Sequence, residues 1–445
     1  MPGMSRKTAI ALAASASIAL LATACTGQAD SGASDDAAKD TTLNFWHAWS
    51  APAEVKAVKD LVAGFEKTHP HIQVNVVGNM TDDKINQALR AGGGKAPDVI
   101  SSFTTNSVGK FCSSGALVDL NPFFEKSGID PEKTFPKAMN EYTQFEGNRC
   151  AVPLLGDAYG LYYNKTAFEK AGITSPPKTW SEFEKVAEKL TIPQGNTYKQ
   201  LGFMPNYHGW ETTTEHYLGQ FSPTYFDKDS KSNVGKDPAF EKAFTMQKKL
   251  VDALGGYRKL ETYRSRLGDE WGPKHPFHTG QVAMQLDGEW RLGMALDTKP
   301  EFEIGVAPLP VPDDQADQYG KGYITGTIAG VAATSTKQNA AWELVKYMTT
   351  DTDAVVNFSN AIHNVPSTLA ALKSPNLKYD PRFKTFLEIA ADPNSTTAPA
   401  SVNGGVYLTT IQEFGYDYES GKATDLKAGL KKTAEQIDTD IAQAK

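Results

Sequence analysis

The alternation of short apolar strands with amphipathic helices is the feature of this sequence that most restricts its fold. Residues 42–46 form an apolar run, residues 72–76 place apolar side chains at every second position, and a third strand starts at residues 97–100. Apolar residues at helical spacing separate these strands, in one helix that starts near Pro52 and another that starts near Thr81. This order predicts an α/β fold with a mostly parallel sheet covered by helices, and ligands bind such sheets beyond the carboxyl ends of the strands.

Length and charge set further limits. A chain of 445 residues is too long for one ordinary hydrophobic core, so two domains are expected. The formal net charge of -7 argues against a nucleic-acid-binding surface, which needs a basic stripe. The sequence has no HExxH, GxSxG or phosphate-loop motif, and no Cys or carboxylate set stands beside His69 and His71. We therefore expect no enzymatic activity, no metal and no cofactor.

Residues 1–24 are expected to be a secretory signal. Two basic residues precede an apolar run over residues 8–24 that is short and weakly hydrophobic for a membrane span. Cleavage before Cys25 would leave that cysteine to carry a lipid, but Ala22 stands where a lipoprotein motif usually has Leu, and an ordinary signal-peptidase site fits the same bond. Residues 25–40 are expected to be a flexible tether. We predict an extracytoplasmic protein anchored to the outer face of the cell membrane through lipidated Cys25.

Two further cysteines, Cys112 and Cys150, remain once Cys25 is assigned to the lipid. An even pair in an exported protein favours a disulfide. The bond would close a loop of about 39 residues and would contribute about 4 kcal/mol in the chain-entropy model. Two free buried thiols are the alternative.

Four segments resemble the family 1 extracellular solute-binding proteins, the family that includes maltose-binding protein. They are AGGGKAPDV at residues 91–99, the stretch from VP through LYYNK to PKTW at 152–180, FHTGQVAM with GEW at 277–290, and GVAPLP with a later AWE at 305–343. Each is weak alone, but together, in this order and behind a signal, they are specific. The resemblance spans nearly all of the chain after the signal.

The resemblance implies a type II periplasmic-binding-protein fold with two α/β lobes, a hinge and an interlobe cleft. Residues 41–155 and 326–358 would form lobe 1, and residues 156–325 and 359–445 would form lobe 2. It also implies a monomeric receptor that captures a sugar or oligosaccharide by lobe closure. The partners would be that carbohydrate and the membrane permease subunits of an ABC importer, with no nucleic acid and no membrane contact beyond the lipid anchor.

A sugar has apolar C–H faces and a rim of hydroxyl groups, so its site needs flat aromatic rings together with carboxylates and amides. By resemblance, Trp290 matches the stacking tryptophan of the family and Asp157 matches a sugar-contacting carboxylate of the crossing segment. Structural roles are the alternative, such as a staple contact with the following helix for Trp49, a hinge hydrogen bond for Asp157 or a solvated carboxylate for Glu289. The predicted ligand-binding residues are His47, Trp49, Ser102, Thr104, Asp157, Tyr159, His208, Trp210, Glu289, Trp290, Tyr323 and Asn364.

Two other functions fit parts of the sequence. Residues 45–47 also resemble the start of the glycerol-3-phosphate-type receptors of the same family. Binding an anion would require a cation in the cleft, for which Arg291 is the candidate beside a predicted aromatic platform. A secreted polysaccharide hydrolase would use two carboxylates such as Asp287 and Glu289, but nothing else in the sequence supports that activity.

Overall fold

The strands of this chain belong to one mixed sheet. A computed structural model describes residues 40–205 and 213–444. In chain order its strands are β1 (Thr41–Trp46), β2 (Ile72–Val77), β3 (Val99–Ser102), β4 (Val152–Asn164), β5 (Ile192–Gln194), β6 (Thr197–Phe203), β7 (Val282–Gly288), β8 (Ile304–Ala307), β9 (Ile324–Val331) and β10 (Val365–Pro366).

Helices surround this sheet. None of those in the described residues is long and apolar enough to cross a membrane. They are α1 (Pro52–Thr68), α2 (Asp82–Ala91), α3 (Val108–Ser113), α4 (Asn121–Lys126), α5 (Pro131–Thr134), α6 (Lys137–Tyr142), α7 (Lys165–Lys170), α8 (Trp180–Leu190), α9 (Thr214–Leu218), α10 (Pro238–Ala253), α11 (Tyr257–Arg264), α12 (Trp290–Asp297), α13 (Gln338–Thr350), α14 (Thr352–Ile362), α15 (Lys384–Ala391), α16 (Val406–Glu419) and α17 (Leu426–Ala444).

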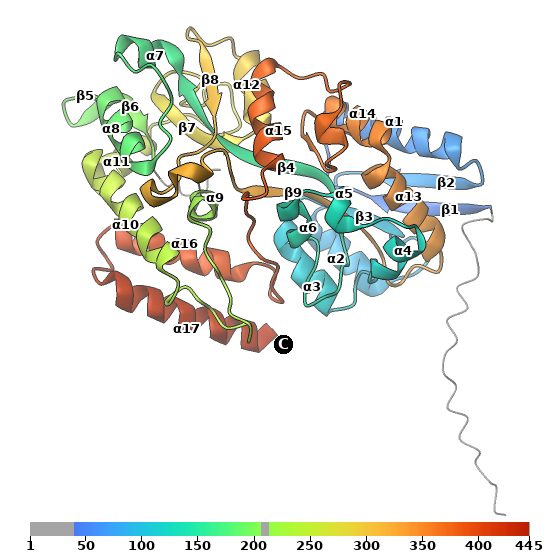
Figure 1. Cartoon of the computed structure of the whole chain (residues 1–445). Helices are drawn as coiled ribbons and strands as arrows, with labels where there is room; N and C mark the ends of the chain where they lie inside the picture. The colour runs from blue at the N-terminus through green and yellow to red at the C-terminus, as the bar shows by residue number, and fades with distance from the viewer. Residues whose placement is uncertain (1–39, 206–212, 445) are drawn as a thin grey trace, which may run out of the picture. The chain divides into compact units, whose positions relative to one another are not determined.

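The sheet runs in the order β2-β1-β3-β9-β4-β7-β6-β5 (Figure 1). β1 is parallel to both β2 and β3, as the sequence predicts. β4, however, pairs in antiparallel fashion with β7, β8, β9 and β10. The prediction of a mostly parallel sheet is therefore right for β1 to β3 and wrong around β4, because β4 and β9 pass through the middle of the sheet in opposite directions.

The long strand β4 joins two groups of strands. Its first part pairs with β9 and β10, with Gly156 opposite both Gly326 and Val365. Its second part, from Tyr159 onward, pairs with β7 and β8. Figure 1 shows β4 running from the group with β7 and β8 to the group with β1 and β3. Side chains from the middle of β4 therefore lie where the two groups meet.

Three large groups of buried apolar side chains hold these layers together. One contains Phe65 and packs α1 and α13 on β1 and β3. A second contains Phe240 and Ile437 and packs α10, α16 and α17 beside β6 and β7. The third draws on both sides of β4, since it contains Phe111 and Phe277. The middle of the molecule is thus packed by residues from distant parts of the chain.

The predicted disulfide is confirmed. Cys112 in α3 and Cys150 just before β4 are bonded, with their Cα atoms 5.4 Å apart. The bond fixes α3 to the start of the central strand. The predicted signal, the tether and Cys25 lie outside the described residues.

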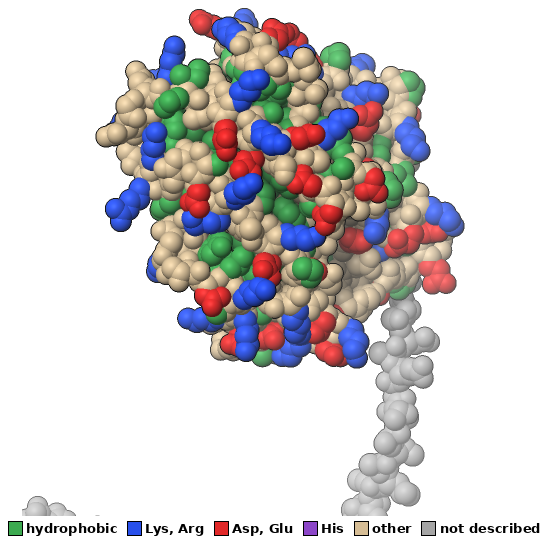
Figure 2. All heavy atoms as spheres, turned by 60° about the vertical axis from the view of Figure 1, so that its left-hand side comes forward, with side chains coloured by type: hydrophobic (Ala, Val, Ile, Leu, Met, Phe, Trp, Pro, Cys, Tyr) green, Lys and Arg blue, Asp and Glu red, His purple; other side chains and the backbone are tan. Residues whose placement is uncertain are grey.

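Charged side chains are mixed on the surface. On the face drawn in Figure 2, Lys and Arg side chains are interspersed with Asp and Glu, without a continuous basic stripe.

Candidate functional site

Three predicted residues follow the carboxyl ends of β1 and β3, and all of them are buried. His47 and Ser102 have no exposed surface, and Trp49 is 3% exposed. Burial lowers the pKa of His47 to about 4, so its ring is neutral at pH 7. The Ser102 hydroxyl donates to Asp82 (2.7 Å) and accepts from the N–H of half-buried Thr104 (3.0 Å). In this conformation the side chains of His47, Trp49 and Ser102 therefore present almost no surface to a ligand.

An exposed aromatic ring at the same strand end was missed by the sequence analysis. Phe103 is 50% exposed, and its ring stands edge-on to Trp49 with 5.3 Å between centroids. Trp49 is in turn edge-on to Phe358 of α14 at 5.4 Å. The buried tryptophan therefore fixes Phe103 as a flat ring open to solvent. Its position directly after Ser102, at a strand end, was the signal that would have identified it.

A second aromatic group lies around the middle of β4. Tyr159 stacks on His216 with 3.8 Å between ring centroids, and it contacts Trp290 at 5.6 Å and Tyr323 at 5.9 Å. The Tyr323 hydroxyl donates to Glu215 (3.3 Å), whose pKa is raised to about 7 by burial. Trp290 is partly exposed, and its indole N–H has no hydrogen-bond partner among the described residues. Trp290 is therefore the partly exposed ring of this group, although its indole N–H is itself buried.

A polar trio meets beside these rings. The Asn364 amide donates to Asp157 (2.7 Å) and to Glu289 (2.8 Å), and Glu289 also accepts the N–H of Ala158 (2.9 Å). Glu289 is 1% exposed, whereas Asp157 and Asn364 are partly exposed. Burial raises the pKa of Asp157 to about 6, and burial together with the neighbouring Asp157 raises the pKa of Glu289 well above its usual value. The trio thus joins β4, the end of β7 and the residue before β10.

The aromatic group and the trio are linked through residues that are close in the chain. Asp157 and Tyr159 stand two positions apart on β4, so their side chains leave the same face of the strand. Glu289 and Trp290 are consecutive at the start of α12. Apolar ring faces next to amide and carboxylate groups suit a molecule with C–H faces and hydroxyl groups.

Arg291, the cation proposed for anion binding, pairs with a carboxylate of the protein itself. Arg291 and Asp287 are both fully buried and form an ion pair, with Nε and Oδ2 2.7 Å apart. The Arg291 guanidinium also donates to the carbonyl of Glu270 (2.9 Å), and the ring of Trp271 lies 5.3 Å from it. Arg291 is therefore a structural partner of Asp287, which is evidence against its predicted role as an anion ligand.

Two predicted residues cannot be placed. His208 and Trp210 lie in residues 206–212, outside the described part of the chain. Within the described part, no group of three or more His, Cys, Asp or Glu side chains is arranged to hold a metal ion.

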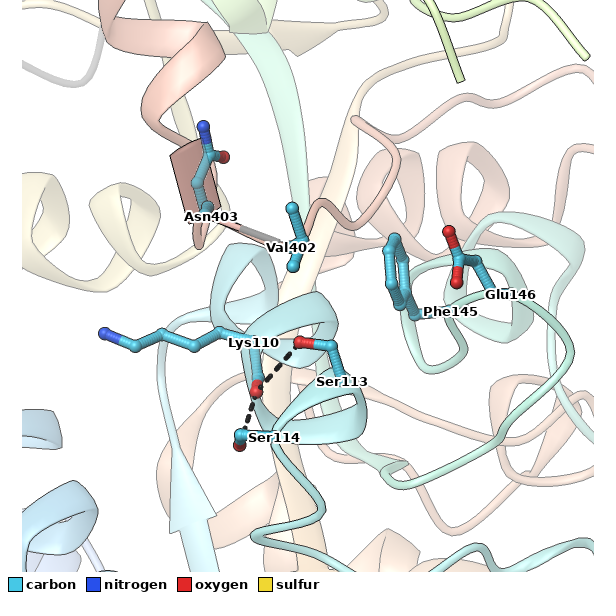
Figure 3. Close-up of a pocket in the computed structure, with 8 residues that line it drawn as sticks. Lys110, Ser113, Ser114, Phe145, Glu146, Val402 and Asn403 are labelled. Atoms are coloured by element: carbon cyan, nitrogen blue, oxygen red, sulfur yellow. Dashed lines mark hydrogen bonds between the residues drawn. The ribbon is translucent and has the colours of Figure 1, made fainter. Parts of the chain in front are cut away.

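A cavity of about 740 Å³ opens next to α3, apart from the rings and the trio (Figure 3). The segment at residues 401–405 forms its opposite side and approaches α3 closely, because a Cβ on Gly109 would lie 2.2 Å from the Ser401 carbonyl oxygen. The cavity lies where the C-terminal part of the chain meets α3, and the sequence did not predict that these two parts of the chain meet. Its lining residues are Lys110, Ser113, Ser114, Phe145, Glu146, Val402, Asn403 and Ala444.

Known proteins resemble this chain over most of its length. The family model for bacterial extracellular solute-binding proteins matches residues 49–355. The maltotriose-binding protein of Pyrococcus abyssi is 24% identical over 396 residues, which cover 88% of this chain and 81% of that protein.

Solved structures agree in fold. The sugar-binding protein MalE of Xanthomonas citri superposes with a TM-score of 0.74 at 22% identity, over 91% of this chain and 98% of that one. UgpB of Mycobacterium tuberculosis in complex with glycerophosphocholine superposes with a TM-score of 0.69 at 20% identity, over 91% and 99%. These matches confirm the predicted α/β fold of the type II periplasmic-binding proteins.

Proposed function

This chain belongs to the bacterial extracellular solute-binding protein family, and on that basis we propose that it captures a sugar or oligosaccharide for an ABC-type importer. Relatives and structural neighbours whose names state binding of maltotriose or sugar support a carbohydrate ligand. The chain would act as a receptor and would carry out no chemical step on its ligand.

One observation carries the carbohydrate assignment: the partly exposed Trp290 follows Glu289 of the trio in the chain, and its ring contacts Tyr159, which leaves the same face of β4 as Asp157. A stacked ring contributes about 0.5–1.5 kcal/mol beyond the area it buries. A few such contacts with charge-assisted hydrogen bonds would reach micromolar affinity, about -8 kcal/mol. Phe103 at the end of β3 offers a second exposed ring from the other group of strands.

Capture would proceed by closure of two lobes. Residues 41–155 and 326–358 would form one lobe, and residues 156–325 and 359–445 the other. A ligand that contacts both lobes stabilises the closed form over the open one. The bulged, glycine-containing pairing of β4 with β9 supports a hinge at this place, because Gly156 faces Gly326 there.

The permease subunits of the importer would recognise the closed arrangement. The protein would act as a monomer, held at the outer face of the cell membrane by a lipid on Cys25 through the tether of residues 25–40. Release after cleavage by an ordinary signal peptidase is the alternative for Cys25. Mass spectrometry of the membrane fraction distinguishes a diacylated Cys25 from an unmodified one.

A receptor for glycerol-3-phosphate or another small polar ligand is the second candidate. Its support is the UgpB structure with glycerophosphocholine. Against it stands the charge around the trio, where two carboxyl groups gather and Arg291 is already paired with Asp287. A phosphate would be repelled there unless the carboxyl groups were neutral.

Titration calorimetry on the mature chain separates these candidates. The panel is a series of mono- and oligosaccharides together with sn-glycerol-3-phosphate and glycerophosphocholine. Micromolar binding of a saccharide, weakened roughly 30- to 150-fold in Trp290→Ala, is the expected result. Binding of a glycerol phosphate compound alone would refute the carbohydrate assignment and keep the receptor role, and release of reducing ends would refute the non-enzymatic role.

A further inference from the structure

The trio holds two carboxyl groups on one amide. Asp157 and Glu289 both accept from Nδ2 of Asn364, at 2.7 and 2.8 Å. Two carboxylates that share a donor at these distances repel each other strongly when both are ionised, and such pairs usually keep one proton between them. The geometry alone therefore argues that the trio is protonated at neutral pH.

No cation compensates this pair within the described residues. Arg291, two residues after Glu289 in the chain, forms its ion pair with Asp287, and both of these side chains are fully buried. The Glu289 carboxylate instead accepts a neutral donor, the N–H of Ala158, at 2.9 Å. Backbone and amide donors stabilise a single negative charge but not two.

The other titratable groups that face the trio are tyrosines. Tyr142 of α6 lies near Asp157, and its fully buried hydroxyl has no hydrogen-bond partner among the described residues. Tyr379 donates its hydroxyl to the Asn364 carbonyl (2.7 Å). Tyr162 of β4 donates to the carbonyl of Gly288 (2.7 Å). Burial raises the pKa of each of the three, so all are neutral near pH 7 and none supplies a charge to the trio.

We propose that Asp157 and Glu289 share one proton in the conformation described here, and that this proton fastens β4, the end of β7 and the segment before β10 to one another. This inference rests on the proposed function, since it assigns the trio a role in holding the binding wall together. Asn364 and Glu289 act as positioning residues for Asp157. Loss of the proton would drive the two carboxylates apart and weaken ligand binding.

Glu289 is the side of the pair that holds the proton. It is 1% exposed, whereas Asp157 is partly exposed and more easily hydrated when ionised. The pKa directions agree, since the pKa of Asp157 is raised to about 6 while that of Glu289 is raised well above its usual value. Between about pH 6 and the higher of these pKa values, the pair would carry one charge and one proton.

The first test needs no ligand. Infrared difference spectra of the mature chain, recorded as the pH rises above 7, should show a loss of protonated carboxyl absorption that is smaller in Glu289→Gln than in the wild type. The part that remains in Glu289→Gln comes from Glu215, whose pKa is raised to about 7. Glu303→Gln is the matched control, because exposed Glu303 pairs with Lys165 and should leave the whole loss in place. Absence of this absorption in the wild type, or an equal loss in Glu289→Gln and the wild type, would overturn the shared proton.

The second test uses the saccharide found by calorimetry. Wild-type affinity should fall as the pH rises above 7, no more steeply than about tenfold per pH unit, which is the limit for one proton. Glu289→Gln has no proton to lose at this position, so its affinity should change much less over the same pH range, whatever its affinity at pH 7. A wild-type affinity that is constant with pH would refute the role in binding. If no saccharide binds, the proposed function fails while the infrared result still decides the proton.

Discussion

Two acidic side chains at the end of β7 are both buried, but one is paired with a cation and the other is not. Asp287 is fully buried against Arg291, with 2.7 Å between Oδ2 and Nε, and its other oxygen accepts the N–H of Gly288 (2.9 Å). Glu289, two positions later, is 1% exposed and has Asn364 and Asp157 as neighbours but no cation. A buried carboxyl must be compensated by a cation or neutralised by a proton, and this short segment contains both solutions.

The difference separates a structural site from a site that can respond to a ligand. The ion pair of Asp287 and Arg291 is complete within the protein and gives a ligand nothing to replace. The trio around Glu289 is held by neutral donors, which a hydroxyl group of a ligand can join or replace. Trp290 lies between Glu289 and Arg291 in the sequence, and its partly exposed ring contacts Tyr159 of β4.

Removing the cation should have the largest effect. Arg291→Met leaves Asp287 buried and unpaired, and breaking a buried ion pair in this way costs about 3–5 kcal/mol of unfolding free energy. Urea unfolding monitored by tryptophan fluorescence measures it. The control is Lys165→Met, which breaks the exposed pair with Glu303 and should cost less than about 1 kcal/mol. Similar losses in the two variants would mean that burial does not distinguish these pairs.

Truncating the ring between the two sites should affect ligand binding more than stability. Trp290→Ala should weaken saccharide binding by about 2–3 kcal/mol, or roughly 30- to 150-fold, because it removes the stacking face. Trp290→Phe keeps a ring and should lose much less. Calorimetry on both variants tests this, and equal affinities for Trp290→Ala and the wild type would remove Trp290 from the site.

The sequence predicted the local part of the fold well. Apolar alternation predicted β1 to β3 to within two residues, and helical spacing predicted helices that start near Pro52 and Thr81, where α1 and α2 begin. It did not predict the role of β4, whose partners β7, β8, β9 and β10 all lie more than a hundred residues later in the chain. Pairing over such distances depends on packing that no local pattern records.

The candidate site was predicted unevenly for the same reason. The resemblance pointed to Asp157 and Trp290, and Glu289 and Asn364 were predicted with them. The structure joins Asp157, Glu289 and Asn364 by hydrogen bonds, although contact of these residues with a ligand remains a prediction. Strand-end reasoning selected His47 and Trp49, but it could not foresee that Phe358 of α14 would help to bury Trp49. It also passed over Phe103, because an apolar residue at a strand end usually belongs to a core.

Removing the shared amide should have a smaller effect than either change above. Asn364→Ala deletes both hydrogen bonds to the carboxyl groups and should cost about 2 kcal/mol of unfolding free energy. It should also raise the pKa of Asp157 further, since the bond from Asn364 lowers it. The control is Asn360→Ala, which loses two surface hydrogen bonds of 3.0 and 2.8 Å and should cost less than about 1 kcal/mol. Carboxyl-carbon NMR titration follows Asp157, and an unchanged or lower pKa would show that Asn364 does not stabilise its ionised form.

The smallest expected effect is the pH dependence of stability that Asp157 contributes. Its pKa is raised from 3.8 to about 6 in the folded protein, so between these values the folded state binds more protons than the unfolded state. Stability from this group is therefore greatest below about pH 4 and falls as the pH rises through 6, by about 1–1.5 kcal/mol between pH 5 and pH 7. Asp157→Asn, which still accepts from Asn364, should lose this slope, whereas Asp287→Asn should lose stability mainly through its ion pair with Arg291. Parallel curves of unfolding free energy against pH for the wild type and Asp157→Asn would show that Asp157 takes up no proton on folding in this pH range.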